Sequence, residues 1–427
     1  MFLGFPLWWV SGIGDVIFIL GAVVMAVVML LRGGIQAPRG FGIWLFFLLW
    51  MLFSVIGIDT SGRLVGFLYR ALLYIAVTVI FLYVYNGRAL MTPRFVLGVL
   101  TGFWLIVVAG GYLGVFFPLL TITTPLAYVL PDFLLNNELV QEMVIRRATQ
   151  FNPDSFLALD PRPSAPFLYT NGWGNAYSLL IPVVIAYLAM VRGERRFWWL
   201  IVALGASLVP ALLTLNRGMF IGLGLAVAYV AVRWLIAGRF RAFFSLLAIG
   251  AVVLAAFFIS PAQERLTNRL SESSTTEDRA NLYEETFLRT VESPLFGYGA
   301  PRPSATNGAP SAGTQGQLWM VMFSHGFPAV IAFNGWLLWV FARSIRRRDP
   351  VGLAGNTILL VISVETLYYG VGTSGLPIAM AVSGLLLGGN APQSSTLVDP
   401  LKLTPSAAAD LLPRTRQAVR PRTQPLP

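Results

Sequence analysis

Six polar residues lie inside apolar runs of the sequence, where charged side chains cost about 2.5–3.5 kcal/mol and usually serve a function. They are Asp15, Arg70, Asn216, Arg217, His325 and Glu365. The arginines have a definite chemistry, because a planar guanidinium binds two phosphate oxygens at once through parallel hydrogen bonds. We therefore expect them to bind an anionic headgroup, either of a phospholipid or of a polyprenyl diphosphate that carries a sugar. Structural roles are the alternative: Arg70 and Glu365 could neutralise each other, and His325 could pack between helices.

The residues that the chain lacks narrow the chemistry further. It has no cysteine and one histidine, which excludes disulfides, thiolate chemistry, haem and zinc clusters and leaves only metals with oxygen ligands, such as magnesium. It also has no phosphate-binding P-loop, no dinucleotide-binding glycine pattern and no paired aspartates of a nucleotide-sugar site. We expect no cofactor and a donor linked to a lipid.

The segments that carry these residues have the composition of a membrane protein. Of the 427 residues, 56% are hydrophobic and 11% are charged, against about 25% charged in soluble proteins. Apolar runs long enough to cross the membrane predict an all-α fold, a polytopic transmembrane helical bundle of about eleven spans. The predicted spans are 6–31, 41–58, 64–85, 95–117, 176–191, 197–215, 219–236, 242–259, 318–341, 353–369 and 371–388.

Arginines at the ends of these spans predict the orientation of the bundle. The short loops on one side hold fourteen of them: Arg32, Arg39, Arg88, Arg94, Arg192, Arg195, Arg196, Arg233, Arg239, Arg241, Arg343, Arg346, Arg347 and Arg348. The short loops opposite hold Arg63 and Arg217. Because positive loops stay in the cytoplasm, we expect a multi-pass plasma-membrane protein with its N-terminus outside and its C-terminus inside. The net charge of +11 then reflects topology and not nucleic-acid binding. The six polar residues fall in the outer half and predict a cavity open to the outer leaflet.

Two loops are too long to be simple turns, and both fall outside in this orientation. They run from about 118 to 175 and from about 261 to 317, within a membrane domain of residues 1–389. Long loops are uncommon and often functional. Residues 390–427 are rich in Pro, Ser, Thr and Arg and predict a disordered cytoplasmic tail.

Each long loop contains a predicted helix. In the second loop the helix begins near Ser274, carries Arg279 in its first turn and ends at Pro294. In the first loop residues 139–151 have a similar pattern, with Arg146 on the polar side. The predicted architecture is a helical bundle with an external cap.

Three short motifs resemble those of one family. Residues 213–218 (LTLNRG) are similar to its arginine signature at the outer end of a span, and residues 170–175 (TNGWGN) to its asparagine-containing helix start. The stretch from Arg279 to the sequence SPLFGYG at 293–299 resembles its arginine, helix and Pro-x-Phe-Gly-x-Gly segment. The family is that of the O-antigen ligases and polymerases, and the likeness covers roughly residues 171–388.

The resemblance implies an inverting, metal-independent C-type glycosyltransferase. Such an enzyme transfers a glycan from a polyprenyl diphosphate, such as undecaprenyl diphosphate, to a glycan or lipid acceptor at the external face of the plasma membrane. Arg217 and Arg279 would then bind the diphosphate and stabilise the charge of the leaving group. Further substrate-binding candidates are Arg70, Asn175, Asn216, Arg289 and Arg302.

One position departs from the family pattern. The family usually has a histidine where the chain re-enters the membrane after the large loop, and here that place is taken by Gln315. A glutamine can orient an acceptor hydroxyl but cannot take its proton. Another base could serve, with His325, Asp278 and Glu277 as candidates, or the reaction could need little base, or the activity could be lost.

Two other classes of function stay open at this stage. A transporter or flippase of a lipid-linked saccharide would have broken helices in paired repeats and polar residues near the middle of the membrane, and no internal repeat is evident. A non-catalytic partner in glycan assembly would hold a lipid-linked glycan for another enzyme, a role compatible with Gln315.

Overall fold

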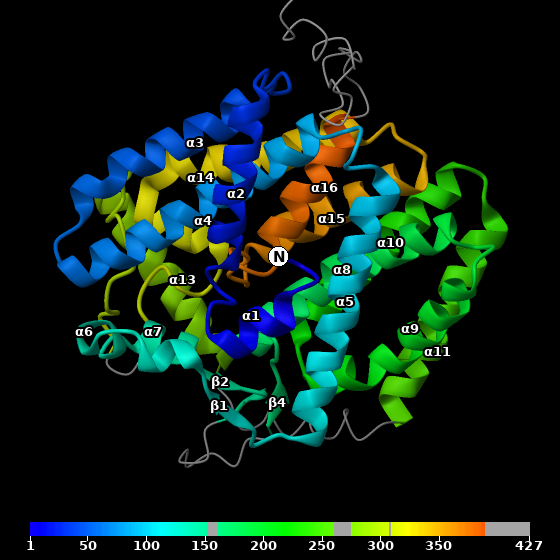
Figure 1. The fold of residues 1–427 in the computed structure, drawn as a ribbon, viewed down its shortest axis with the longest axis horizontal. Helices are drawn as coiled ribbons and strands as arrows, with labels where there is room; N and C mark the ends of the chain where they lie inside the picture. The colour runs from blue at the N-terminus through cyan, green and yellow to red at the C-terminus, as the bar shows by residue number, and fades with distance from the viewer. Residues whose placement is uncertain (152–160, 260–274, 307–308, 389–427) are drawn as a thin grey trace, which may run out of the picture. The chain divides into compact units, whose positions relative to one another are not determined.

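The computed structural model describes residues 1–151, 161–259, 275–306 and 309–388 (Figure 1). The predicted tail, 390–427, lies outside the described residues, as does the predicted helix start at Ser274. The helices are α1 (Phe5–Ser11), α2 (Ile17–Arg32), α3 (Gly42–Phe53), η1 (Ser54–Gly57), α4 (Ser61–Asn86), α5 (Pro93–Phe116), η2 (Pro125–Tyr128), α6 (Asp132–Leu135), α7 (Glu138–Val144), α8 (Thr170–Met190), α9 (Arg195–Leu213), α10 (Arg217–Ile236), α11 (Phe240–Ile259), α13 (Thr275–Glu292), α14 (Gln317–Ser344), α15 (Pro350–Glu365) and α16 (Leu376–Gly388).

The predicted spans coincide with helices. Six helices are long and apolar enough to cross a membrane, namely α4, α5, α8, α9, α10 and α14. Five shorter apolar segments, in α2, α3 with η1, α11, α15 and α16, match the other predicted spans. A polytopic helical membrane protein is therefore confirmed, while the count of eleven spans stays a prediction.

The first predicted span, 6–31, is two helices separated by a turn. Helix α1 ends at Ser11 because Gly12 has a left-handed φ of 91°, and its N–H donates to the Trp9 carbonyl. Helix α2 begins only at Ile17. Asp15 therefore lies in the turn between two helices and not inside a span.

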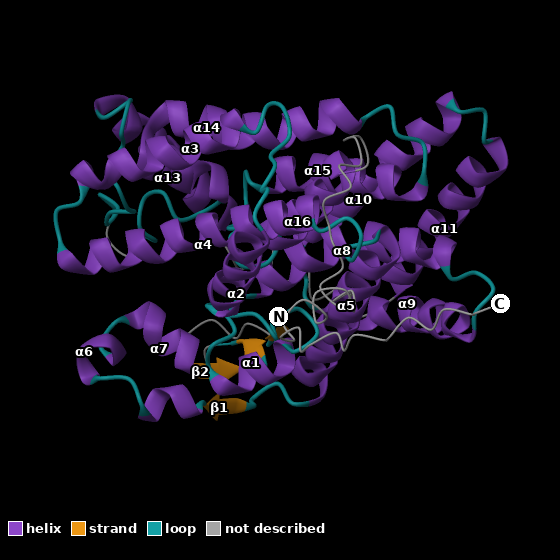
Figure 2. Ribbon diagram, turned by 45° about the horizontal axis from the view of Figure 1, so that its top comes forward, coloured by secondary structure: helices purple, strands orange, loops and turns teal. Residues whose placement is uncertain are grey.

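The first long loop contains the four short strands β1 (Thr121–Thr123), β2 (Ile145–Arg147), β3 (Thr149–Gln150) and β4 (Arg162–Pro163). Strand β1 pairs antiparallel with β2, and β3 with β4; Figure 2 shows β1 and β2 beside α1. The predicted helix 139–151 is wrong beyond Val144, where α7 ends and β2 begins. β-branched residues on both strands favour this pairing. As a result, Arg146 does not lie on a polar helix face: it is opposite Ile122 and only 1% exposed.

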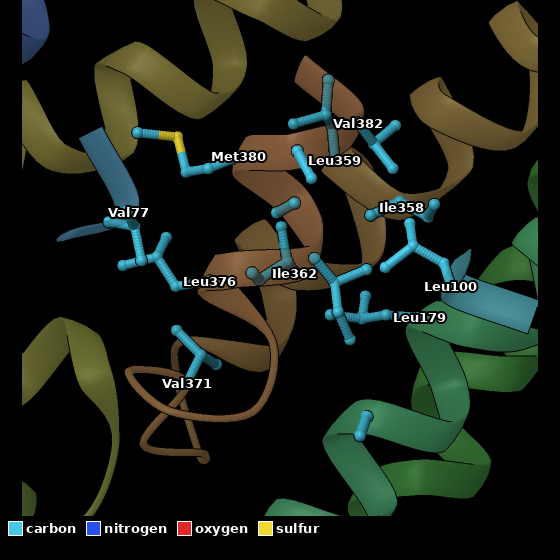
Figure 3. Packing of buried hydrophobic residues seen from close by; sticks show 14 of the residues in the cluster. Val77, Leu100, Leu179, Ile358, Leu359, Ile362, Val371, Leu376, Met380 and Val382 are labelled. Carbon is cyan, nitrogen blue, oxygen red and sulfur yellow. The ribbon is translucent and has the colours of Figure 1, made fainter. Parts of the chain in front are cut away.

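The core of the bundle surrounds α16, whose residues are all buried. It packs against α4, α5, α8, α14 and α15. Figure 3 shows this packing, with Leu376 and Met380 of α16 among Val77, Leu179 and Ile362 of the neighbouring helices. By contrast, α9 and α10, at the right of Figure 1, are mostly exposed and apolar, as expected for helices that face lipid.

Contacts between the short turns place the arginine-rich segments at one end of the bundle. The amide of Asn86 pairs with the backbone of Gln36, Arg94 forms an ion pair with Glu194, and Arg233 donates to the Arg347 carbonyl at 2.8 Å. The N-termini of α8, α10 and α14 are at the other ends of the helices that these turns join.

Candidate functional site

A cavity of about 1050 Å³ lies where the N-termini of α8, α10 and α14 meet. It is also lined by α4, α13, the α1–α2 turn, the first long loop and residues 368–374. Its size is slightly above the roughly 300–1,000 Å³ typical of ligand pockets. Helix N-termini carry partial positive charge, so three of them around one cavity favour an anion there.

Arg217 reaches the cavity from a tight turn between α9 and α10. Leu215 has a positive φ of 49°, an uncommon conformation for a leucine. Asn216 holds the turn, since its Nδ2 donates to the Thr170 carbonyl at 2.9 Å and its Oδ1 accepts from the Tyr369 hydroxyl. Because this turn is fixed to α8 and to the α15–α16 segment, Arg217 begins α10 with its side chain among the cavity-lining residues.

Arg279 reaches the same cavity from α13. This helix is fixed to α14 by a ring stack between Tyr283 and Trp319, with centroids 4.5 Å apart. It is fixed to the segment before α14 by the Gly313 N–H, which donates to Thr286 Oγ1 at 3.2 Å. Leu282 and Thr286 are buried on this side of the helix. The packing holds the first turns of α13, and with them Arg279, beside the start of α14.

The SPLFGYG segment anchors the other end of α13 to a kink in α14. Gly326 interrupts α14 with φ 81°, which frees backbone groups of the preceding turn. The N–H groups of Tyr298 and Gly299 donate to the carbonyls of Phe323 and Ser324, and the Phe327 N–H donates to the Pro294 carbonyl. A Cβ on Gly326 would lie 2.2 Å from the Leu295 carbonyl oxygen. The motif therefore has a structural role. It provides hydrogen-bond partners for the backbone groups that the kink leaves unpaired within α14, and it positions α13.

The charge of the cavity is strongly positive. Four arginines line it, Arg70, Arg162, Arg217 and Arg279, against a single acid among the described lining residues, Asp15. Within the described ranges, neither Arg70, Arg217 nor Arg279 has a carboxylate partner. The Asp15 carboxylate, in turn, forms an ion pair with Arg146 at 2.7 Å. The unpaired arginines leave a site for an anion with more than one negative charge.

Gln315 also lines the cavity, directly before α14. Its neighbour Gln317 is fixed, because its Nε2 donates to the Tyr74 hydroxyl at 2.6 Å and its Oε1 accepts from the Val371 N–H at 3.1 Å. These contacts hold the N-terminus of α14 in place. The position of Gln315 allows it to contact a ligand in the cavity, and the role that we expected for it stays a prediction.

Other sequence-predicted residues lie outside the cavity lining. Asn175 donates to Glu365 at 2.5 Å, and Glu365 also accepts from Ser178, so the alternative in which Arg70 neutralises Glu365 is wrong. His325 is 2% exposed, and its Nδ1 lies 2.6 Å from Ser54 Oγ. These contacts agree with the alternative in which His325 packs between helices. The side chains of Asp278 and Glu277 lie outside what the structure describes.

Arg289 and Arg302 also lie outside the lining, and both have structural partners. Arg289 pairs with Glu285 at 3.0 Å and donates to the Pro303 carbonyl. Arg302 donates to the Gly57 carbonyl at 3.1 Å, and its guanidinium carbon lies 4.3 Å from the centre of the Tyr298 ring. Both arginines hold the segment that follows α13.

The pKa of Glu285 reflects this network. Burial acts to raise the pKa, but hydrogen bonds from the Ser304 hydroxyl, the Ala305 N–H and Arg289 outweigh it and hold the pKa below its ordinary value. The carboxylate is therefore ionised at neutral pH and balances Arg289.

Several lining residues were not predicted from the sequence. Arg162 donates to Gln150 at 3.3 Å, and Gln150 also accepts from the Thr170 N–H at the start of α8. Tyr369 was assigned only to a span. No local pattern marks these residues, since they reach the cavity through loop conformations that depend on tertiary contacts.

Comparison with known protein families agrees with this geometry. Residues 201–333 match the family model described as O-antigen ligase. The chain carries an O-antigen ligase family domain. This domain contains Arg217, Arg279 and Gln315, whereas Asp15, Arg70 and Tyr369 complete the cavity from outside the matched segment. The protein is thus a multi-pass membrane protein in which residues 201–333 are similar to O-antigen ligases. No curated protein matches the chain.

Proposed function

We propose that this protein transfers a glycan from a polyprenyl diphosphate to a hydroxyl of a glycan or lipid acceptor. The observation that carries the proposal is that Arg217 and Arg279 come from separate segments to line one cavity, without carboxylate partners in the described structure. Family membership over residues 201–333 supports ligase- or polymerase-type chemistry and a lipid-linked glycan as substrate.

The reaction needs charge stabilisation more than proton transfer to the leaving group. The acceptor oxygen attacks the anomeric carbon, the bond from that carbon to the diphosphate oxygen breaks, and the configuration inverts. The departing phosphate gains one negative charge and so carries two, because no proton accompanies the bond cleavage. Arg217 and Arg279 bind these oxygens in a bidentate way, and the N-terminus of α10 adds its dipole. No metal ion is required in this scheme.

The proposed orientation places the cavity at the external face. The arginine-rich turns join helices at the end opposite the cavity, and the positive-inside rule assigns that end to the cytoplasm. The N-terminus is then outside and the C-terminus inside. A lipid-linked donor enters from the outer leaflet, where nucleotide sugars are scarce.

The proposal is tested by deleting the gene and measuring lipid-linked glycans by mass spectrometry. The deletion strain is complemented with wild type, Arg217→Ala, Arg279→Ala or the control Arg147→Ala, which removes an exposed arginine of the first loop. We expect wild type and the control to clear the accumulated intermediates, and the two cavity variants to leave them. Accumulated single repeats indicate a polymerase, and accumulated long chains indicate a ligase. An unchanged lipid profile in the deletion strain, or full clearance by Arg279→Ala, contradicts the proposal.

A further inference from the structure

The cavity contains an acid that the diphosphate does not explain. Asp15 lies in the α1–α2 turn and is the one acidic side chain among the described residues of the lining. A carboxylate next to a diphosphate would repel it, so Asp15 is not a donor-binding group. Its place in a cationic cavity calls for a different partner.

The carboxylate is held on one side only. Its Oδ2 is buried 2.7 Å from Arg146 Nη2, and Arg146, only 1% exposed, also donates to the Gly12 carbonyl at 3.3 Å. Tyr69 of α4 donates to the Asp15 backbone carbonyl at 3.3 Å. The side chain keeps 11% exposure. Within the described structure Oδ1 has no hydrogen-bond partner, and it is therefore the oxygen available to the cavity.

Asp15 reaches the cavity from a different element than Arg217 and Arg279 do. Its contacts are with β2 and α4, whereas Arg217 and Arg279 come from α10 and α13. A cavity of about 1050 Å³ holds both a diphosphate-linked sugar and part of a second sugar. The Asp15 carboxylate is thus held by other elements than Arg217 and Arg279, the two arginines proposed to bind the diphosphate.

Glycosyl transfer leaves one proton to be moved. The acceptor hydroxyl loses its proton as its oxygen bonds to the anomeric carbon, and the diphosphate leaves without taking it. The described lining holds no histidine or lysine and no second carboxylate, and amide side chains do not accept protons at neutral pH. Among the described lining residues, the carboxylate of Asp15 can accept the proton, through its Oδ1.

We propose that Asp15 is the acceptor-side base: its Oδ1 binds the acceptor hydroxyl and takes its proton, while Arg146 fixes the carboxylate. The inference rests on the proposed transferase function. Its substrate class is a sugar hydroxyl, and the proton passes from Asp15 to solvent after the product leaves.

The test uses the full-length protein in lipid nanodiscs, with lipid-linked glycan extracted from the deletion strain as donor. Asp15→Asn keeps the shape of the side chain and an oxygen for Arg146. We expect it to bind undecaprenyl diphosphate as wild type does and to transfer glycan about 10²-fold more slowly, as for the loss of a general base. Asp15→Ala should regain transfer as formate is added, because formate supplies a carboxylate that a purely structural role would not use. Glu194→Gln, which changes a partly exposed acid at the arginine-rich end, should match wild type.

The outcomes separate the inference from the proposed function. If Asp15→Asn transfers as fast as wild type while Arg279→Ala does not, the base assignment is overturned and the transferase stands. If Asp15→Ala binds undecaprenyl diphosphate but does not respond to formate, the base assignment is also overturned. If wild type itself consumes no donor, the proposed function and this inference fail together.

Discussion

The two ends of α13 use arginine in opposite ways. Near its start, Arg279 lines the cavity and has no carboxylate partner among the described residues. Near its end, Arg289 pairs with Glu285, and Arg302 in the following segment packs on Tyr298 and binds the Gly57 carbonyl. All three occur in the motif region of the O-antigen ligase domain. The presence of an arginine in a motif is therefore insufficient to assign a binding role. That role depends on whether partners within the protein already bind the guanidinium.

The largest effect is expected at Arg279. Arg279→Ala should lower transfer about 10²–10³-fold, as for the loss of a group that stabilises a developing anion, and should leave thermal stability unchanged because no ion pair within the described structure is lost. Arg279→Lys should recover only part of the rate, since a lysine lacks the bidentate fork. Single-turnover rates and melting temperatures of the purified protein measure both. A clear fall in melting temperature for Arg279→Ala would show that Arg279 stabilises the fold, as Arg289 does at the other end of α13.

The next largest effect is expected at the kink in α14, because the kink holds α13 in place. Gly326→Ala puts a Cβ 2.2 Å from the Leu295 carbonyl oxygen at a φ of 81°, and should cost about 1–3 kcal/mol from backbone strain alone. We expect a lower melting temperature and lower transfer together. Gly335→Ala on the same helix is the control, since its Cβ would approach nothing closer than 3.8 Å. Equal melting temperatures of the two variants would contradict the role of the kink.

Arg302→Ala should affect stability and not donor binding. It removes a partly exposed pair with Asp59 and a contact with the Tyr298 ring, and the ring contact is worth about 1 kcal/mol. The measurement is a chemical or thermal unfolding curve, with undecaprenyl diphosphate binding measured in parallel. Weaker binding at an unchanged melting temperature would instead support the substrate-binding role expected from the sequence.

The smallest effect concerns pH. The pKa of Glu285 is lowered in the folded protein, so the folded state binds this proton less readily than the unfolded state does. Its contribution to stability is therefore present above the ordinary pKa of a glutamate and is lost as pH falls through the lower, folded-state value. Wild type should lose more stability than Glu285→Gln on acidification below about pH 4.3. If the melting temperatures of the two proteins fall equally as pH is lowered over this range, the stabilising role of the Glu285 hydrogen bonds is contradicted.

The sequence predicted the helices of the bundle and the pair Arg217 and Arg279, because hydropathy and short motifs are local signals. It did not predict that Asp15 and Arg146 meet, since they are far apart in the chain and Arg146 lies on a strand in place of a helix. It also listed Arg302 as a further substrate-binding candidate, because the partners of Arg302 come from another segment and could not be recognised from the sequence. What was missed depends on tertiary contacts that no local pattern encodes.

The burial of α16 has a consequence for how the protein is made. Its thirteen residues span about 20 Å at 1.5 Å per residue, short of the roughly 30 Å that a membrane core requires. All of its sides face protein, so lipid does not stabilise it directly. Its insertion is therefore expected to depend on α4, α8 and α15 having already assembled around its place, and amino-acid changes in those helices should appear first as failed biogenesis of the C-terminal segment.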